Sequence, residues 1–165
     1  MLMIETNEFR NAMSLLTGAV NVITTAGPTG RFGFTASAVC SVTDNPPTLL
    51  VCMNKSSNSH QHFVNNRILS VNVLHAEQQN VSQAFASKLS AEERFNMGEW
   101  RTLETGAPIL ENALVNFDCS IDQIQEVGTH TIFICKIEAI QQGEYAEGLV
   151  YFNRAYHPVG NCQPA

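Results

Sequence analysis

The sequence has 165 residues, which suits one domain that is large enough to bury a hydrophobic core. It carries 9 Lys and Arg against 15 Asp and Glu, and a formal charge of -6 offers nucleic-acid phosphates no general attraction. No apolar run approaches the roughly 18–20 residues of a membrane-spanning helix, and residues 1–9 lack the basic and apolar regions of a signal peptide, so we expect a cytoplasmic protein without membrane contact.

Charged residues make up only 15% of the chain, against a typical quarter. In a small domain this low share suggests that another subunit covers part of the surface. We expect a single domain over residues 1–165 that associates with a second subunit.

The five cysteines form an odd and scattered set, and none stands at zinc-ligand spacing from a pair of histidines. We therefore expect no metal, and reduced thiols, four of them in apolar strand-like runs. The cysteines are Cys40, Cys52, Cys119, Cys135 and Cys162.

The first predicted elements are a helix and a hairpin. Phe9, Met13 and Leu16 recur at helical spacing and predict an amphipathic helix from residue 6 or 7 to residue 16. Strands are predicted over 19–25 and 31–35, joined by a turn at Gly27–Gly30.

The middle of the chain alternates short strands with short helices. Pro46 and Pro47 force an extended turn. The elements predicted after that turn are a strand over 48–53, a helix that Ser57 or Ser59 caps and that reaches Asn65, a strand over 68–74, a helix over 76–86, and a short helix opened by a capping box at Ser90–Glu93.

The last third predicts long strands. Alternating runs over 113–125 and 129–142 meet at Val127–Gly128, and a shorter run covers 148–152. The count is about seven strands, largely neighbours in sequence and so mostly antiparallel. No GxGxxG motif supports a doubly wound fold. The pattern therefore favours a mainly β fold with peripheral helices, a closed or nearly closed antiparallel barrel.

Small and hydroxylated side chains dominate residues 33–43. Such residues let a flat ligand approach the main chain, whose amide and carbonyl groups can recognise the edge of a heterocycle. An extended backbone would place the alternating hydroxyls on one face, to bind ribityl oxygens or phosphate; the same pattern also fits a strand that only pairs with its neighbours. The alternating residues are Thr35, Ser37, Ser41 and Thr43.

Three further segments are candidates for binding. Residues 54–59 combine serines and Lys55 before a predicted helix, which fits an anion site or simple capping. His130 stands at the head of a long predicted strand. Its imidazole could lie beside a cofactor, or it could be only a polar side chain at a turn. In 151–158, aromatic residues flanking Arg154 could grip a nucleotide, or could seal the end of the barrel.

Several chemistries lack support in the sequence. There is no GxSxG motif, no paired-histidine motif and no evident carboxylate pair. Cys40 and His130 could form a nucleophile and its base, but they lie far apart in sequence and the indication is weak. Hydroxyls with few titratable groups suit a protein whose cofactor performs the reaction.

The residues over 34–47 and 49–52 strongly resemble the short-chain flavin reductase family. Further motifs of that family follow in order, and the similarity extends from about Phe9 to Pro158. They are Ser70–Leu74, Phe85–Ala86, Glu93–Phe95, Gly128–His130 and Leu149–Phe152. The resemblance implies an FMN-binding split β-barrel with a Greek-key-like strand order, a homodimer, and flavin in a groove near the dimer interface.

The resemblance also implies an NAD(P)H:flavin oxidoreductase of the FMN reductase type. NADH, or NADPH, would reduce FMN or FAD by hydride transfer, and the reduced flavin would pass to a separate flavin-dependent monooxygenase. Residues 116–119 and 132–140 resemble reductases of pyrimidine (uracil) degradation, the preferred reading, whereas Tyr156–Pro158 resembles those serving 4-hydroxyphenylacetate 3-monooxygenase. Two alternatives are a non-catalytic flavin-binding split barrel and an enzyme of the pyridoxamine-phosphate oxidase type.

Site residues follow from the same resemblance by position. The flavin would contact Thr35, Ala36, Ser37, Ala38, Val39, Cys40, Ser41 and Phe85, and its phosphate would meet Asn54, Lys55 and Ser57. The nicotinamide nucleotide would lie at His130, the catalytic candidate, with Arg154 and Tyr156.

Overall fold

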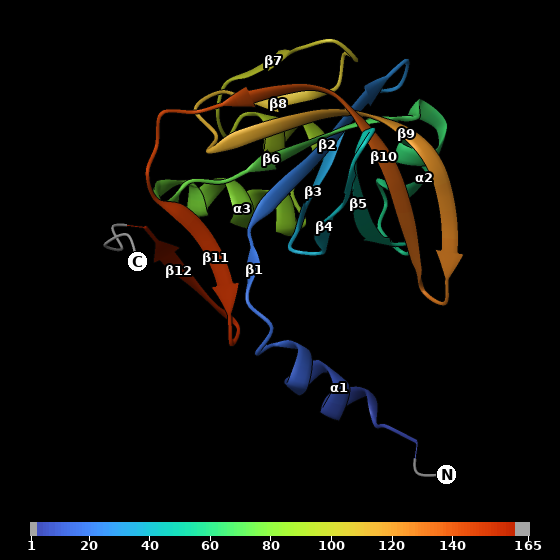
Figure 1. Cartoon of the computed structure of the whole chain (residues 1–165), viewed down its shortest axis with the longest axis vertical. Helices are drawn as coiled ribbons and strands as arrows, with labels where there is room; N and C mark the ends of the chain where they lie inside the picture. The colour runs from blue at the N-terminus through green and yellow to red at the C-terminus, as the bar shows by residue number, and fades with distance from the viewer. Residues whose placement is uncertain (1–2, 161–165) are drawn as a thin grey trace.

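The computed structural model describes residues 3–160, in which long antiparallel strands form one curved seven-stranded sheet (Figure 1). Its alternating sequences pair over nearly their full lengths, as in the hairpin of β9 and β10. In spatial order the strands are β3 (Gly30–Ala36), β2 (Asn21–Gly27), β6 (Ile68–Val73), β9 (Val115–Val127), β10 (His130–Gln142), β5 (Pro47–Asn54) and β4 (Val39–Asp44).

The sheet curls into a nearly closed barrel because its two edges are joined by a very short link. β3 and β4 lie at opposite edges, yet only Ser37 and Ala38 separate them in sequence. Three Cα–Cα steps reach at most about 11 Å, so the edges must meet. The Cys52 amide donates to the Ala38 carbonyl at 3.0 Å and holds the link beside β5. The prediction of a closed or nearly closed antiparallel barrel is confirmed.

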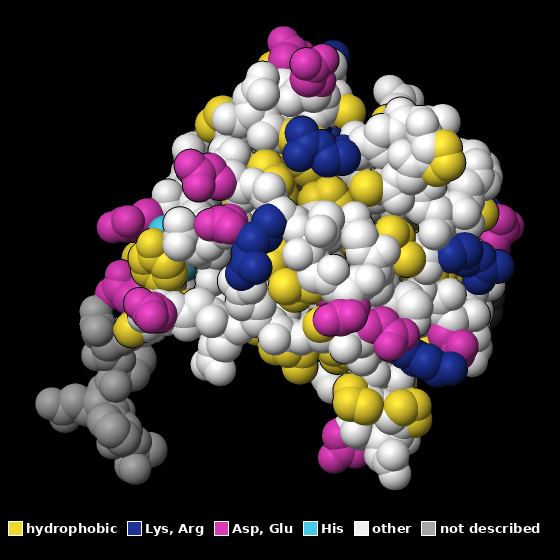
Figure 2. Space-filling model, turned by 90° about the horizontal axis from the view of Figure 1, so that it is seen from above, with side chains coloured by type: hydrophobic (Ala, Val, Ile, Leu, Met, Phe, Trp, Pro, Cys, Tyr) yellow, Lys and Arg dark blue, Asp and Glu magenta, His cyan; other side chains and the backbone are white. Residues whose placement is uncertain are grey.

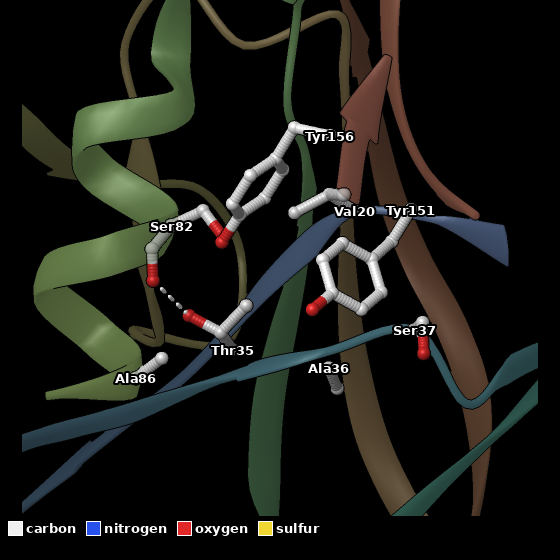
Figure 3. A pocket seen from close by; sticks show the side chains of 8 residues that line it. All are labelled: Val20, Thr35, Ala36, Ser37, Ser82, Ala86, Tyr151 and Tyr156. Carbon is white, nitrogen blue, oxygen red and sulfur yellow. Dashed lines mark hydrogen bonds between the residues drawn. The ribbon is translucent and has the colours of Figure 1, made fainter. Parts of the chain in front are cut away.

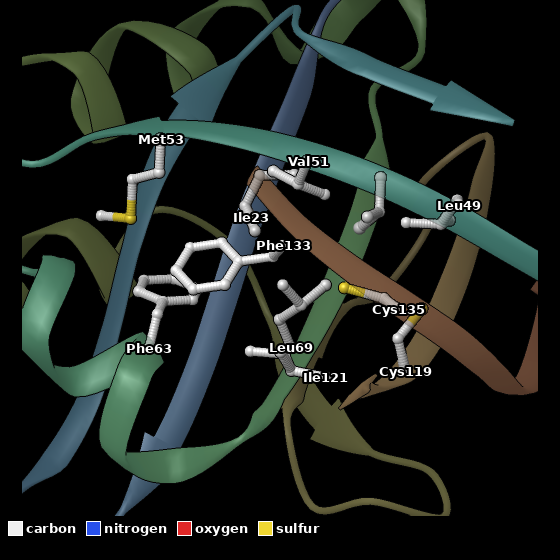
Figure 4. Packing of buried hydrophobic residues seen from close by; sticks show 11 residues of the cluster. Ile23, Leu49, Val51, Met53, Phe63, Leu69, Cys119, Ile121, Phe133 and Cys135 are labelled. Atoms are coloured by element: carbon white, nitrogen blue, oxygen red, sulfur yellow. The ribbon is translucent and has the colours of Figure 1, made fainter. Parts of the chain in front are cut away.

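The barrel interior is filled by alternate residues of its strands (Figure 4). Leu49, Val51 and Met53 of β5 are buried there, opposite Phe133 of β10. Phe63 of α2 (His60–Asn66) is fully buried in the same cluster. This period-two burial is the alternation seen in the sequence.

The described cysteine thiols differ in how deeply they are buried. Cys119 and Cys135 lie in the barrel core, where burial raises the pKa of both, that of Cys135 to about 12, so they stay neutral and unreactive. Cys40 is exposed and Cys52 is half-buried, and all four described cysteines are free. Cys162 lies outside the described residues.

Helices and a small sheet pack on the outside of the barrel. The second buried cluster lies between them, with Phe85 against Phe95 and Trp100. The capping box predicted at Ser90–Glu93 is present. The remaining elements are η1 (Ala76–Gln78), α3 (Gln79–Ala86), α4 (Ala91–Phe95), the sheet of β1 (Gly18–Ala19), β11 (Gly148–Phe152) and β12 (Ala155–Val159), and the pair β7 (Trp100–Thr102) and β8 (Pro108–Leu110).

The N-terminal helix α1 (Thr6–Met13) projects from the body of the molecule (Figure 1). None of its residues is buried, and Phe9, Met13 and Leu16 expose their apolar side chains. The turn between β11 and β12 tethers the helix: the Arg154 guanidinium donates to Asn11 Oδ1 at 2.7 Å. The predicted amphipathic helix is confirmed, but it ends at Met13 and not at residue 16, and a single chain leaves its apolar face uncovered.

Some details differ from the sequence prediction. Residues 3–160 contain twelve strands instead of about seven, and the five that were not predicted are β1, β4, β7, β8 and β12. β1, β7 and β8 have only two or three residues, too few to show alternation, whereas β4 and β12 lie in segments that were examined for binding and not assigned to a strand of their own. Among the same residues, no helix has the length and apolar character that crossing a membrane requires. On the face seen in Figure 2, Lys and Arg side chains stand apart from one another, and some of them lie beside Asp or Glu side chains.

Candidate functional site

A pocket of about 240 Å³ lies where the end of β3 meets α3 and the β11–β12 hairpin (Figure 3). Its walls come from segments far apart in the chain. The lining residues are Val20, Thr35, Ala36, Ser37, Ser82, Ala86, Tyr151 and Tyr156.

Two glycines set the walls of this pocket. A Cβ at Gly33 would lie 2.7 Å from Phe85 Cε1 and 2.9 Å from the Ile23 carbonyl, so the missing side chain lets α3 lie directly against β3. A Cβ at Gly18 would lie 3.1 Å from the Ser37 Cβ, so β1 also approaches β3 closely.

Hydrogen bonds fix α3 between the other two walls. The Thr35 hydroxyl donates to the Ser82 carbonyl at 2.6 Å, and the hydroxyls of Ser82 and Tyr156 are 2.8 Å apart. The rings of Tyr151 and Tyr156 meet edge to face, with centroids 5.2 Å apart. The three segments therefore form one connected, rigid frame.

The chemistry of the pocket is that of binding. None of its eight lining residues is charged or an acid–base catalyst at neutral pH. Hydroxyls and backbone groups beside apolar carbon suit a flat, uncharged, hydrogen-bonding ring. The volume lies below the roughly 300–1,000 Å³ of ordinary ligand pockets, so it would hold only part of a nucleotide cofactor.

The predicted hydroxyl face is wrong, because the chain changes strand within it. Thr35 and Ser37 line the first pocket, whereas Ser41 and Thr43 lie on β4 at a second hollow of about 310 Å³. The break at Ser37–Ala38 sends the two halves to opposite edges of the sheet. The second hollow is lined by Val39, Cys40, Ser41, Thr43, Asp44, Pro47, Thr48, Leu49, Phe117 and Ile137.

The segment predicted to bind phosphate lies beside His130. His130 pairs with Asn54 in the β5–β10 ladder, and the Lys55 amide donates to the Thr129 carbonyl at 3.0 Å. The Lys55 ammonium group lies 3.5 Å from a Glu126 carboxylate oxygen, and His130 Nδ1 is hydrogen-bonded to Thr129 Oγ1 at 2.9 Å. Both side chains are on the surface.

The serines before α2 differ from simple caps. Ser59 occupies the N-cap position, but its side chain makes no capping hydrogen bond. The Ser57 hydroxyl instead accepts from the Ser59 amide at 3.4 Å. The Asn54 side-chain oxygen accepts two hydrogen bonds from Ser56, so part of this loop is already satisfied internally.

Other predicted site residues lie away from the pocket. Phe85, on the buried face of α3, is 1% exposed, so its ring presents no surface. The Arg154 guanidinium is occupied by Asn11 of α1. The structure brings Thr35, Ala36, Ser37 and Tyr156 together and leaves Phe85 and Arg154 outside the group.

Cys40 and His130 do not form a nucleophile–base pair. Cys40 pairs with Leu50 and His130 with Asn54, four residues apart along β5, which corresponds to roughly 13 Å. Burial raises the pKa of the neighbouring Cys52 thiol, and proximity to Cys40 adds to the effect. Within residues 3–160, no cluster of three His, Cys, Asp or Glu could hold a metal.

Sequence reasoning did not assign four of the eight lining residues to the site: Val20, Ser82, Ala86 and Tyr151. Ser82 is fully buried on the inner face of α3, and a serine between Val81 and Phe85 on an apolar helix face was the available signal. Tyr151 belongs to the aromatic C-terminal segment, but only the structure shows that its ring lines the pocket.

Comparisons with known proteins agree on one family. Residues 13–160 match the flavin reductase like domain. The chain is 53% identical over 156 residues to the FMN reductase (NADH) RutF of Pantoea ananatis (strain LMG 20103), covering 94% of this chain and 82% of that protein.

Solved structures share the fold. A candidate flavin reductase of Haemophilus somnus 129pt is 56% identical, with a TM-score of 0.93 over 94% of this chain and all of that one. BorF, the flavin reductase component of a bacterial two-component tryptophan halogenase, is 26% identical, with a TM-score of 0.88 over 96% of this chain and 100% of its own. The expected family and fold class are confirmed.

Proposed function

This chain belongs to the flavin reductase like domain family, and we propose that it is an NADH-dependent flavin reductase that supplies reduced FMN to a separate monooxygenase. The name of the Pantoea ananatis relative supports FMN and NADH, and BorF supports a two-component arrangement. One observation carries the proposal: the family's small-residue segment lines a pocket without charged or nucleophilic side chains. Such a pocket suits cofactor-borne chemistry.

The residues present fit a flavin. Gly18 keeps open the approach to Ser37, which a larger residue would crowd, and the Ser37 hydroxyl has no partner among the described residues. Bound flavin would accept hydride from NADH and carry its electrons away. Thr35, Ala36 and Ser37, which line the pocket, would orient the ring and ribityl chain, and Asn54, Lys55 and Ser57 would bind the phosphate. FAD is the alternative flavin and NADPH the alternative donor.

A turnover assay tests the function. Catalytic amounts of the protein with excess FMN should deplete NADH absorbance rapidly, and omission of either protein or FMN should abolish the loss. A protein that binds FMN without oxidising NADH or NADPH would instead be a flavin-binding module. Repeating the assay with FAD in place of FMN, and with NADPH in place of NADH, gives the flavin and nicotinamide preferences of the enzyme directly.

His130→Ala should slow reduction of the bound flavin more than it weakens flavin binding. His130 is exposed at the head of β10, where a nicotinamide nucleotide could reach it. Stopped-flow reduction and flavin titration separate the two effects, and we expect roughly a hundredfold lower rate, the low end for loss of a positioned catalytic group. An unchanged reduction rate would remove His130 from the site.

We also propose a cytoplasmic homodimer. The exposed apolar face of α1 and the low charge of the chain support association with a second copy. Sedimentation should give twice the 18.1 kDa of the chain, and a monomer at micromolar concentration would contradict the proposal.

The monooxygenase served is proposed to act in pyrimidine degradation, because the Pantoea ananatis relative is a RutF protein. 4-Hydroxyphenylacetate 3-monooxygenase is the alternative partner. Coupling the reductase to each oxygenase and measuring product distinguishes the two.

A further inference from the structure

Tyr151 presents a free aromatic face to the pocket. Tyr151 is 39% exposed and pairs on β11 with Gly18 of β1. Figure 3 shows the ring projecting from β11 into the pocket, with its hydroxyl directed toward β3. That hydroxyl has no hydrogen-bond partner within residues 3–160, and neither has the Ser37 hydroxyl.

Tyr156 lines the same pocket, but its hydroxyl already has a partner. Its hydroxyl is bonded to Ser82 at 2.8 Å, and its ring supports Tyr151 edge to face at 67°. The Ser82 carbonyl is in turn bonded by Thr35. Tyr156 is thus held by α3 on one side and braces Tyr151 on the other.

The free groups define the class of ligand. An aromatic face, two unpartnered hydroxyls and the absence of charge in the lining favour an uncharged conjugated ring with carbonyl or amide groups at its edge. A pocket of about 240 Å³ accepts such a ring and leaves charged phosphates outside. Both isoalloxazine and nicotinamide have this chemistry.

We propose that Tyr151 binds the heterocycle of one of the two cofactors through ring contact and its hydroxyl, and that Tyr156 is a positioning residue that acts through Tyr151. The inference rests on the proposed function, because that function supplies the two ring systems. It assigns to Tyr151 the stacking role that the sequence alone would give equally to Tyr156 or Arg154.

Equilibrium titrations of the full chain test the inference without turnover. The probes are FMN, followed by its own fluorescence, and NADH, followed by its fluorescence and with FMN absent. The variants are Tyr151→Ala, Tyr151→Phe and Tyr156→Phe. Tyr145→Ala is the matched control, since Tyr145 is 44% exposed and stacks on His75 at another hollow.

Tyr151→Ala should raise the Kd of one ligand roughly tenfold, as stacked rings do on truncation. Tyr151→Phe, which keeps the ring and the fold, should raise it about fivefold through loss of a hydrogen bond. A change for FMN identifies isoalloxazine, and a change for NADH alone identifies nicotinamide. The control should leave both Kd values within twofold of the unmodified protein.

The role of Tyr156 has its own readout. Tyr156→Phe should weaken the same ligand as Tyr151→Phe, and should have no further effect when Tyr151 is already alanine. The inference is overturned if both Tyr151 variants bind FMN and NADH as the control does. A protein that fails the turnover assay but shows the Tyr151 effect would lose the proposed activity and keep this binding site.

Discussion

Replacing Asn72 with Leu should lower the free energy of unfolding by about 3–5 kcal/mol. Asn72 is fully buried, and its amide donates to the Val22 carbonyl at 2.9 Å and to Thr24 Oγ1 at 3.2 Å. Its side-chain oxygen accepts from the Leu110 amide and from Asn116 Nδ2, both at 2.8 Å. Leucine would leave several of these groups buried without partners, which costs far more than the bonds contribute.

Urea unfolding followed by circular dichroism measures this change, provided that the denaturant slope is unaltered. The control is Asn80→Leu, because Asn80 is exposed on α3 and makes none of these contacts. That variant should remain within about 0.5 kcal/mol of the unmodified protein. A loss below about 1 kcal/mol for Asn72→Leu would show that the network is dispensable.

Adding a single methyl group at Gly33 should cost about 2–4 kcal/mol of stability and weaken flavin binding at the same time. The new Cβ would lie 2.7 Å from Phe85 and 2.9 Å from the Ile23 carbonyl, too close for either to remain in place. The Gly33 carbonyl also accepts a 2.8 Å hydrogen bond from Arg94, whose burial lowers its pKa. α3 would therefore move away from β3, and the pocket frame would open.

Gly33→Ala is measured by urea unfolding and by FMN titration. A second substitution identifies the cause: Phe85→Leu removes the ring that the methyl group meets, so the double variant should lose less stability than the sum of the two single ones. If the stability losses of the two single variants simply add, the cost of Gly33→Ala does not come from the contact with the Phe85 ring. Unchanged FMN affinity would show that the pocket does not depend on α3.

The local elements were largely predictable because their signals lie within a few residues. Alternation located β9 and β10, helical spacing located α1, and Ser90 with Glu93 marked the start of α4. Elements of two or three residues, such as β1 and β8, carry no measurable period and form only because neighbouring strands supply their partners.

The site was predictable in part. The small-residue segment identified Thr35 and Ser37 correctly as lining the pocket, since only such residues leave the main chain open. The placement of Ser41 on the same face assumed one continuous strand, and Arg154 was assigned to a nucleotide although it is bonded to Asn11. Both depend on contacts between segments distant in sequence.

By itself, the sequence determined the strand-rich architecture, the small hydroxylated segment and the lack of a nucleophilic or metal motif, because periodicity and side-chain size act locally. Only the tertiary structure decided that Ser37 and Tyr151 line one pocket, because closing the barrel sends β3 and β4 to opposite edges and brings β11 to the end of β3. Which of the two tyrosines keeps a free hydroxyl depends on the bond between Tyr156 and Ser82, 74 residues apart.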